Sequence, residues 1–281
     1  MARATAGSSS PSRRRNALCA AVLALACDGV EGPLVHTSES GQPTPAVWSP
    51  APGSSWQAQL SGDVDPSLDV TFFYLDPDNL SEQSRAELES AGKHVACYFS
   101  AGSLEPWRDD ADQFPAGAVG NPLAGYPDEQ WLDIRDPTVH ALMTARIERL
   151  AALGCEGALP ANLEAYQADS GFDLTRDDEL AYATFLSSSI HAQGMSAGLT
   201  ITAELIPEVA AAFDWGLVID CLDSGGCGAY QPVRAAGKAV FMVEFGDETD
   251  VATVCPAAEQ LGFDALIKEP DLGAFRVPCP G

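Results

Sequence analysis

Acidic side chains follow several of the segments that the sequence predicts to be buried β-strands. Asp76 comes after one apolar segment and Glu105 after a second. Asp220 and Glu244 end two others, and Glu164 follows a further one. Hydrolysis of a glycosidic bond needs two carboxyl groups, about 5–5.5 Å apart for retention of configuration and about 6.5–9.5 Å apart for inversion. These residue types suit that chemistry, although acids at strand ends also cap helices or pair with arginine.

Aromatic side chains stand near the same strand ends. Tyr98, Trp107, Tyr126 and Trp131 offer flat rings that can stack on a sugar, and the alternative for each is a place in the core. Arg108 follows Glu105 by three residues. A cleft lined by these side chains predicts a carbohydrate ligand.

Eight short segments read as strands, and helical patterns separate most of them. The strand candidates are Trp56–Leu60, Val70–Leu75, His94–Ser100, Glu156–Leu159, Ser196–Thr200, Gly216–Asp220, Ala239–Glu244 and Asp264–Lys268. Several are apolar throughout, as parallel strands buried on both faces are. Helices are predicted over Ser81–Ala91, over Pro137–Leu153 and after Thr175. The pattern predicts an α/β fold, a single (β/α)8 TIM barrel, with an open doubly wound sheet as the alternative.

Other catalytic motifs lack support. Gly194-Met195-Ser196-Ala197-Gly198 matches the G-x-S-x-G pattern of nucleophilic serines, but a helix is predicted before it and a strand after it, the reverse of what the motif requires. The chain has no glycine-rich nucleotide loop after a strand, and neither histidines nor cysteines have the spacing of metal ligands. We expect no metal and no cofactor.

The N-terminal part predicts export. Residues 1–27 combine an arginine-rich start with a short apolar run, and they end at Cys27 in a sequence similar to a bacterial lipoprotein cleavage site. The alternatives are a lipid anchor at Cys27 and plain secretion, with export by the twin-arginine route a further possibility. Residues 28–55 are rich in Pro, Gly and Ser and predict a flexible linker, and residues 56–281 form the barrel domain.

The remaining six cysteines suit an oxidising compartment. Cys221 and Cys227 bracket a short loop, and Cys255 and Cys279 flank the last strand, so both pairs are predicted disulfides. Cys97 and Cys155 lie in apolar runs, which predicts buried free thiols for these two.

The chain is strongly acidic. It has 15 Lys and Arg against 40 Asp and Glu, a net charge of −25, and loss of residues 1–27 would leave 11 against 40, or −29. Such a charge repels nucleic acid and anionic lipid and attracts a polycation. The alternative is that the charge serves solubility alone.

One segment resembles a known family. Cys97-Tyr98-Phe99-Ser100-Ala101-Gly102, with Glu105 and Arg108, is similar to the C-Y-F-S-A-G-x-x-E-x-x-R signature of glycoside hydrolase family 114, the endo-α-1,4-polygalactosaminidases. Similarity continues at the first strand, at Trp131–Arg135, at Ala165-Tyr166 and at Gly237–Glu244. The resemblance implies a TIM barrel that acts on a cationic, partly deacetylated galactosamine polymer. It implies contacts from Tyr98, Glu105, Trp107, Arg108, Asn162 and Glu244.

The sequence departs from the family where the resemblance implies catalytic carboxylates. The family typically reads E-P-D-N after the fourth strand, and this chain has Leu159-Pro160-Ala161-Asn162. The family reads N-E-Q-C after the sixth strand, and this chain has Val218-Ile219-Asp220-Cys221. Carboxylates implied at Leu159 or Ala161 and at Ile219 are therefore replaced by apolar residues.

Three hypotheses follow. The first is an exported, monomeric binder of a cationic amino-sugar polysaccharide whose hydrolytic activity is weak or lost. The second is an active hydrolase with a relocated carboxylate pair, for example Asp76 or Glu164 together with Asp220. Asp220 must leave regular strand geometry to reach the barrel mouth, because successive strand residues face opposite sides. The third is a structural or interaction protein without sugar affinity.

Overall fold

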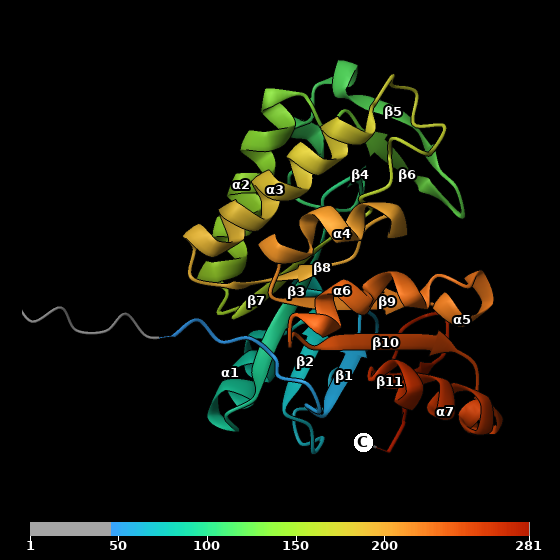
Figure 1. Ribbon diagram of the computed structural model, residues 1–281. Helices are drawn as coiled ribbons and strands as arrows, with labels where there is room; N and C mark the ends of the chain where they lie inside the picture. The colour runs from blue at the N-terminus through green and yellow to red at the C-terminus, as the bar shows by residue number, and fades with distance from the viewer. Residues whose placement is uncertain (1–45, 281) are drawn as a thin grey trace, which may run out of the picture. The chain divides into compact units, whose positions relative to one another are not determined.

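Eight parallel strands form a curled sheet in the computed structural model, which describes residues 46–280 (Figure 1). Neighbours follow the order β1-β2-β3-β7-β8-β9-β10-β11, and the short antiparallel strand β12 (Val277–Pro278) adds to β11. The parallel strands are β1 (Trp56–Gln59), β2 (Phe72–Leu75), β3 (His94–Ser100), β7 (Gly157–Ala161), β8 (Ser196–Leu199), β9 (Trp215–Ile219), β10 (Val240–Phe245) and β11 (Asp264–Lys268). The predicted β/α barrel is confirmed, and each of the eight predicted strands is present within one or two residues of its expected bounds.

Alternate residues of these strands fill the barrel interior. The Phe241 ring of β10 lies 4.9 Å from Trp56 of β1, 4.9 Å from Phe72 of β2 and 6.1 Å from Trp215 of β9, measured between ring centroids. Strands far apart in the sheet order thus meet at one point, which requires the sheet to curl around a packed core. Gly198 of β8 leaves room for this core, since a Cβ there would lie 2.5 Å from the Trp215 ring.

The first and last parallel strands meet through side chains and loops. The Gly53 N–H donates to Asp264 over 2.9 Å, and Leu60 N–H donates to the Leu272 carbonyl over 2.8 Å. Lys268 at the end of β11 contacts Gln57 of β1 at 3.3 Å. These bonds join the two edges of the sheet.

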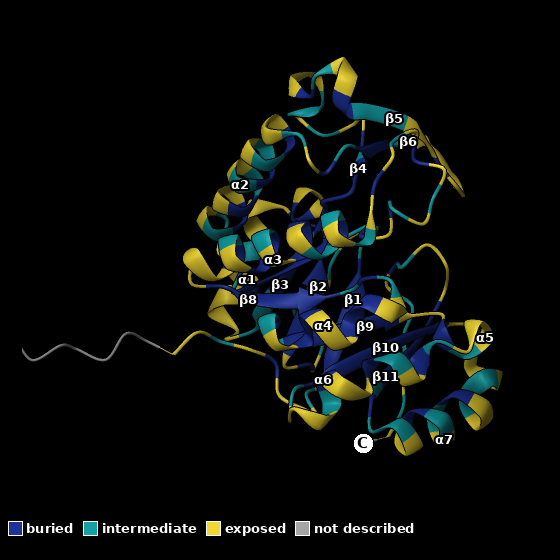
Figure 2. Cartoon of the chain, turned by 45° about the horizontal axis from the view of Figure 1, so that its top comes forward, coloured by how far each residue is buried: buried dark blue, intermediate teal, exposed yellow. Residues whose placement is uncertain are grey.

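Helices cover the outside of the sheet, with one face buried and one exposed (Figure 2). Thr175 forms the predicted capping box with Asp178, and Ser81 and Asp136 also accept backbone N–H groups in the first turns of their helices. The α-helices are α1 (Glu82–Ser90), α2 (Pro137–Ala152), α3 (Arg176–Ala192), α4 (Ile206–Val209), α5 (Cys221–Ser224), α6 (Gln231–Ala235) and α7 (Val251–Leu261). The 3-10 helices are η1 (Pro77–Asn79), η2 (Ala111–Gln113), η3 (Ala116–Ala118), η4 (Ala203–Leu205), η5 (Ala210–Ala212), η6 (Cys227–Tyr230) and η7 (Glu248–Asp250).

A second, three-stranded sheet interrupts the alternation between β3 and β7. It consists of β4 (Ser103–Leu104), β6 (Tyr126–Leu132) and β5 (Val119–Leu123), paired antiparallel in the order β4-β6-β5. Figure 1 shows β5 and β6 far from α7. The sequence did not predict this sheet.

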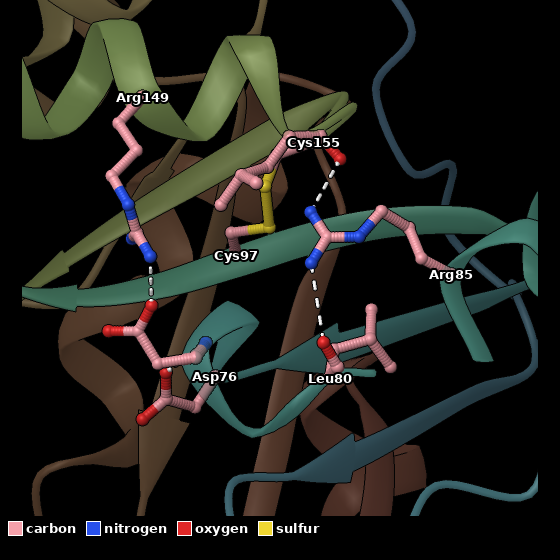
Figure 3. The surroundings of a disulfide bond; sticks show 8 residues. Asp76, Leu80, Arg85, Cys97, Arg149 and Cys155 are labelled. Atoms are coloured by element: carbon pink, nitrogen blue, oxygen red, sulfur yellow. Dashed lines mark hydrogen bonds and ion pairs between the residues drawn. A yellow bond between two sulfur atoms is a disulfide. The ribbon is translucent and has the colours of Figure 1, made fainter. Parts of the chain in front are cut away.

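Three disulfides join the cysteines of the barrel. Cys221–Cys227 and Cys255–Cys279 are paired as predicted. The prediction of free thiols was wrong for the third pair, because Cys97 and Cys155 are bonded to each other with their Cα atoms 5.9 Å apart. Cys97 lies on β3 and Cys155 just before the adjacent β7, so strand pairing brings the two sulfurs together. Figure 3 shows Arg85 beside this disulfide, where it donates to the carbonyls of Leu80 and Leu153.

The chain before β1 already packs on the barrel. Trp48 stacks on His94 with ring centroids 4.6 Å apart, and His94 in turn contacts Glu156 at 2.8 Å. Of the predicted linker 28–55, only residues 46–55 lie in the described part. The predicted export signal 1–27 and the predicted lipidation at Cys27 lie outside the described residues. Among residues 46–280 no helix combines the length and the apolar character needed to cross a membrane.

Candidate functional site

A cavity of about 880 Å³ opens at the carboxyl ends of the strands. Its floor is formed by inward-facing residues at or just beyond the carboxyl ends of β1, β2, β3, β7, β8 and β9. On β2 the buried Phe72 and Tyr74 lead to Asp76, and on β9 Trp215 and Leu217 lead to Ile219. The floor residues are Leu60, Tyr74, Asp76, Tyr98, Leu159, Ala161, Thr200 and Ile219. This is the end of a β/α barrel at which enzymes place their active sites.

Apolar side chains occupy the positions where the family resemblance implies carboxylates. Leu159, Ala161 and Ile219 all line the cavity. Leu159 is buried in the barrel core, whereas Ile219 is 37% exposed at the mouth. None of these side chains can donate a proton or attack an anomeric carbon.

Arg108 forms the most highly connected polar group of the cavity. Its Nε and Nη2 donate to Glu105 at 2.7 and 2.9 Å, and Nη1 and Nη2 donate to Asp76 at 3.0 and 2.9 Å. Nη1 also contacts Asp78 at 2.7 Å. The guanidinium lies 5.8 Å from the centre of the Tyr98 ring, whose hydroxyl donates to Glu105 over 3.2 Å. The donors of Arg108 are thus occupied by the protein's own carboxylates.

Charge pairing and burial shift the pKa values of Arg108, Asp78 and Tyr98. Burial opposes the charge of Arg108, but its bonds to Glu105 and Asp76 outweigh burial and raise its pKa. Burial likewise works against ionised Asp78, yet Arg149 and Arg108 hold the pKa of Asp78 below its ordinary value. Figure 3 shows Arg149 reaching down toward this cluster from α2. Burial and the nearby Glu105 carboxylate raise the pKa of Tyr98, so its hydroxyl stays protonated.

Glu164 differs from the clustered acids. It lies in the turn after β7 and lines the cavity, and no hydrogen bond from residues 46–280 reaches its carboxyl group. The residue is exposed to solvent, and partial desolvation by the surrounding protein raises the pKa of its carboxyl group. It is an acid available to a ligand.

Asp220 and Glu244, two residues expected at the site, lie elsewhere. Val243 faces the barrel interior, so Glu244 faces outward, where it accepts the N–H groups of Cys221 and Leu222 at 2.8 and 3.1 Å. Asp220 does leave strand geometry, with φ +53°, but its side chain is exposed and does not line the cavity. Strand parity turns Glu244 away from the cavity, and the left-handed backbone at Asp220 leaves its side chain outside the cavity wall.

Asn162 lines the cavity and also fixes the local backbone. Its φ is +63°, and its amide donates to the hydroxyls of Ser100 and Ser103 at 2.9 Å each. Ser103 donates in turn to the buried Glu129 over 2.5 Å. Gly102 makes this approach possible, because a Cβ there would lie 1.7 Å from the Asn162 carbonyl oxygen.

The sequence analysis named the two aromatic residues at the rim of the cavity but not the wall segment that follows β11. Pro270, Asp271 and Leu272 follow β11 and enter the wall together. Tyr126 and Trp107 stand at the rim with 63% and 57% of their surface exposed, and Tyr126 comes from the unpredicted antiparallel sheet. Their place depends on tertiary folding. A strand-end search would have found Pro270 to Leu272.

One close group of metal-ligand types occurs within the described part of the chain. Side-chain atoms of Cys221, Cys227 and Glu244 lie within 4.8 Å of one another. The two sulfurs are bonded in a disulfide, which removes them as ligands.

A β/α barrel with a polar and aromatic cavity at the carboxyl ends of its strands has the architecture of a glycoside hydrolase. The family model of glycoside-hydrolase family GH114 matches residues 37–281, and the chain belongs to this family. The resemblance noted in the sequence is thereby confirmed.

Solved structures agree with this assignment. The chain is similar to Aspergillus fumigatus Ega3, solved in complex with galactosamine, with 32% identity, a TM-score of 0.79, and coverage of 84% of this chain and 99% of Ega3. The glycoside hydrolase domain of PelA from Pseudomonas aeruginosa shares the fold, with 17% identity, a TM-score of 0.63, and coverage of 80% and 98%. No protein among the curated ones matches the chain.

Proposed function

We propose that the protein is an exported GH114-fold protein that binds a cationic galactosamine-type polysaccharide and hydrolyses it weakly or not at all. The observation that carries this proposal is the composition of the cavity. Its polar wall of Tyr98, Glu105, Arg108 and Asn162 is present, whereas Leu159, Ala161 and Ile219 stand at the positions implied for catalytic carboxylates.

Charge supports a cationic ligand. Six acids and two arginines line the cavity, so an ammonium group is attracted into it and an anionic sugar is repelled. The similar Ega3 was solved with galactosamine, an amino sugar. The aromatic rim of Trp107 and Tyr126 adds apolar ring faces for sugar stacking.

The disulfides and the N-terminal sequence support export of the protein. Three disulfides suit an oxidising compartment, and residues 1–27 read as an export signal. The alternatives of lipidation at Cys27 and release as a soluble monomer both fit this proposal.

Glu164 supports a second function, hydrolysis by relocated carboxylates. A general acid needs a raised pKa, which Glu164 has, and Asp76 is a second carboxyl group in the same cavity. Asp76 is bound by Arg108, however, and Asp220 lies outside the wall. A binder without hydrolysis therefore fits the geometry better.

Binding is tested by titrating the protein with a partly deacetylated α-1,4-galactosamine polymer in a calorimeter. We expect saturable binding that weakens at least several-fold in Trp107→Ala and stays unchanged in Phe245→Ala, an exposed aromatic substitution away from the cavity. Absence of saturable binding would leave the third hypothesis, a structural or interaction protein. New reducing ends that vanish in Glu164→Gln would establish the relocated hydrolase.

A further inference from the structure

A buried carboxyl group lies directly beneath the cavity loop and has no role in the site described so far. Glu179 of α3 is 0% exposed. Its Oε2 accepts the Tyr166 N–H at 3.4 Å, a long bond, and its Oε1 has no hydrogen-bond partner among the described residues. A buried carboxyl oxygen left unpaired is costly, so such a group needs an explanation.

The contact with Tyr166 joins Glu179 to the loop that carries Glu164. This loop forms a tight turn in which Gln167 N–H donates to the Glu164 carbonyl over 3.0 Å. Glu164 lines the cavity, and Glu179 faces the inner side of the same turn. The two carboxyl groups are therefore neighbours across one turn of backbone, one open to a ligand and one sealed.

The charged and titratable groups around Glu179 include no cation at ion-pair distance within residues 46–280. The loop presents Glu164, and α3 itself presents Asp178 and Tyr182. Arg146 of α2 faces Tyr182 and binds Asp110. Burial raises the pKa of Glu179 to about 7, and the opposing effect of the Tyr166 N–H is the next largest. The Glu164 charge adds to the rise, and the Ala165 N–H opposes it to a smaller extent.

We propose that Glu164 and Glu179 act as a coupled pair that releases a proton to solvent when an ammonium group of the ligand comes to lie beside Glu164. The inference rests on the proposed function and deepens it. Glu179 is a positioning residue that never touches the ligand. Without ligand, two adjacent carboxylates repel each other and the pair retains a proton. A bound cation offsets that repulsion, and both groups ionise.

The proton is counted by calorimetry of a fully deacetylated α-1,4-galactosamine oligomer at pH 7 in two buffers of different ionisation enthalpy. We expect release of roughly half a proton per occupied site, as for a group that is half ionised beforehand. Glu179→Gln, which keeps the shape and the acceptor for Tyr166, should bind the oligomer and release less than half as much. The control variant Glu148→Gln lacks an exposed carboxyl group on α2, and it should release as many protons as the wild type. The amines of the oligomer contribute the same proton exchange to the wild type and both variants, so this contribution cancels in the comparison.

Equal proton release by the wild type and Glu179→Gln, with binding intact, would overturn the inference and leave the proposed function standing. Carbon NMR of the glutamate carboxyl groups tests the pair without ligand. We expect one resonance with a titration midpoint near pH 7. This resonance should be absent in Glu179→Gln, and its midpoint should move to lower pH in Glu164→Gln. Absence of such a resonance would overturn the inference even if the polymer does not bind.

Discussion

Lys268 is a charged side chain in a place that solvent does not reach. It is 0% exposed, and its ammonium group is held by the Gly273 carbonyl at 2.6 Å and by Gln57 at 3.3 Å. No carboxylate pairs with it within the described residues. Burial, with a smaller contribution from Arg276, lowers the pKa of Lys268 to about 8.

This lysine makes stability depend on pH. Between about pH 8 and pH 10 the unfolded chain keeps the proton that the folded protein has lost, so the free energy of unfolding rises with pH. We expect a gain of about 2 kcal/mol between pH 8 and 9.5 from this group. Above pH 10 the buried tyrosines, whose pKa values are raised, oppose it.

Urea unfolding at pH 8 and pH 9.5 measures this gain. The gain should be present in the wild type and in the control variant Lys93→Met. Lys93 is a half-buried lysine that donates to the Val70 carbonyl. The gain should be lost in Lys268→Met. The same gain in Lys268→Met would show that other groups cause it.

At the scale of single residues, the signature around β3 predicted much of the cavity. Tyr98, Glu105, Trp107, Arg108 and Asn162 all line it. Sequence alone did not place Glu244 and Asp220, because the first depends on which residues of β10 face the interior and the second on the left-handed turn after β9. The buried Glu179 and Lys268 gave no signal, since a charged side chain in a sequence reads as exposed.

At the scale of elements, hydrophobic patterns predicted the parallel strands and the capped helices well. The antiparallel sheet was missed because Val119–Leu132 contains two glycines and two prolines, which read as loop. The Cys97–Cys155 bond was missed because each cysteine lies in an apolar run. Adjacency of β3 and β7 in the barrel, which sets the pairing, is a tertiary feature.

The disulfides should differ in their effect on stability. Cys97–Cys155 closes a loop with a sequence separation of 58 residues and Cys221–Cys227 one of 6. Because a longer loop has more entropy to lose, replacing the first pair by alanines should cost about 4 kcal/mol and the second about 2 kcal/mol. Denaturant unfolding of the two double variants measures the difference. An equal cost would show that local packing, and not loop closure, sets the effect.

At the scale of the whole molecule, the net charge of −25 should govern encounter with the polymer. We expect the association rate with a deacetylated polymer to fall at least tenfold between 20 and 300 mM salt, since salt screens charges over about 10 Å at 0.1 M. A fully acetylated, neutral polymer should show little salt dependence. Stopped-flow or surface-based kinetics with both polymers would distinguish them. Equal salt dependence for both would exclude charge attraction as the cause.

The most direct test of the central claim is a reducing-end assay on the partly deacetylated α-1,4-galactosamine polymer, with the wild type beside the double variant Ala161→Asp and Ile219→Glu. These substitutions restore carboxyl groups at two positions that line the cavity. We predict weak or no turnover by the wild type, with saturable binding in the same sample, and clearly faster turnover by the variant. Turnover by the wild type as fast as that of the variant would contradict the account and show that this chain hydrolyses the polymer with other carboxyl groups.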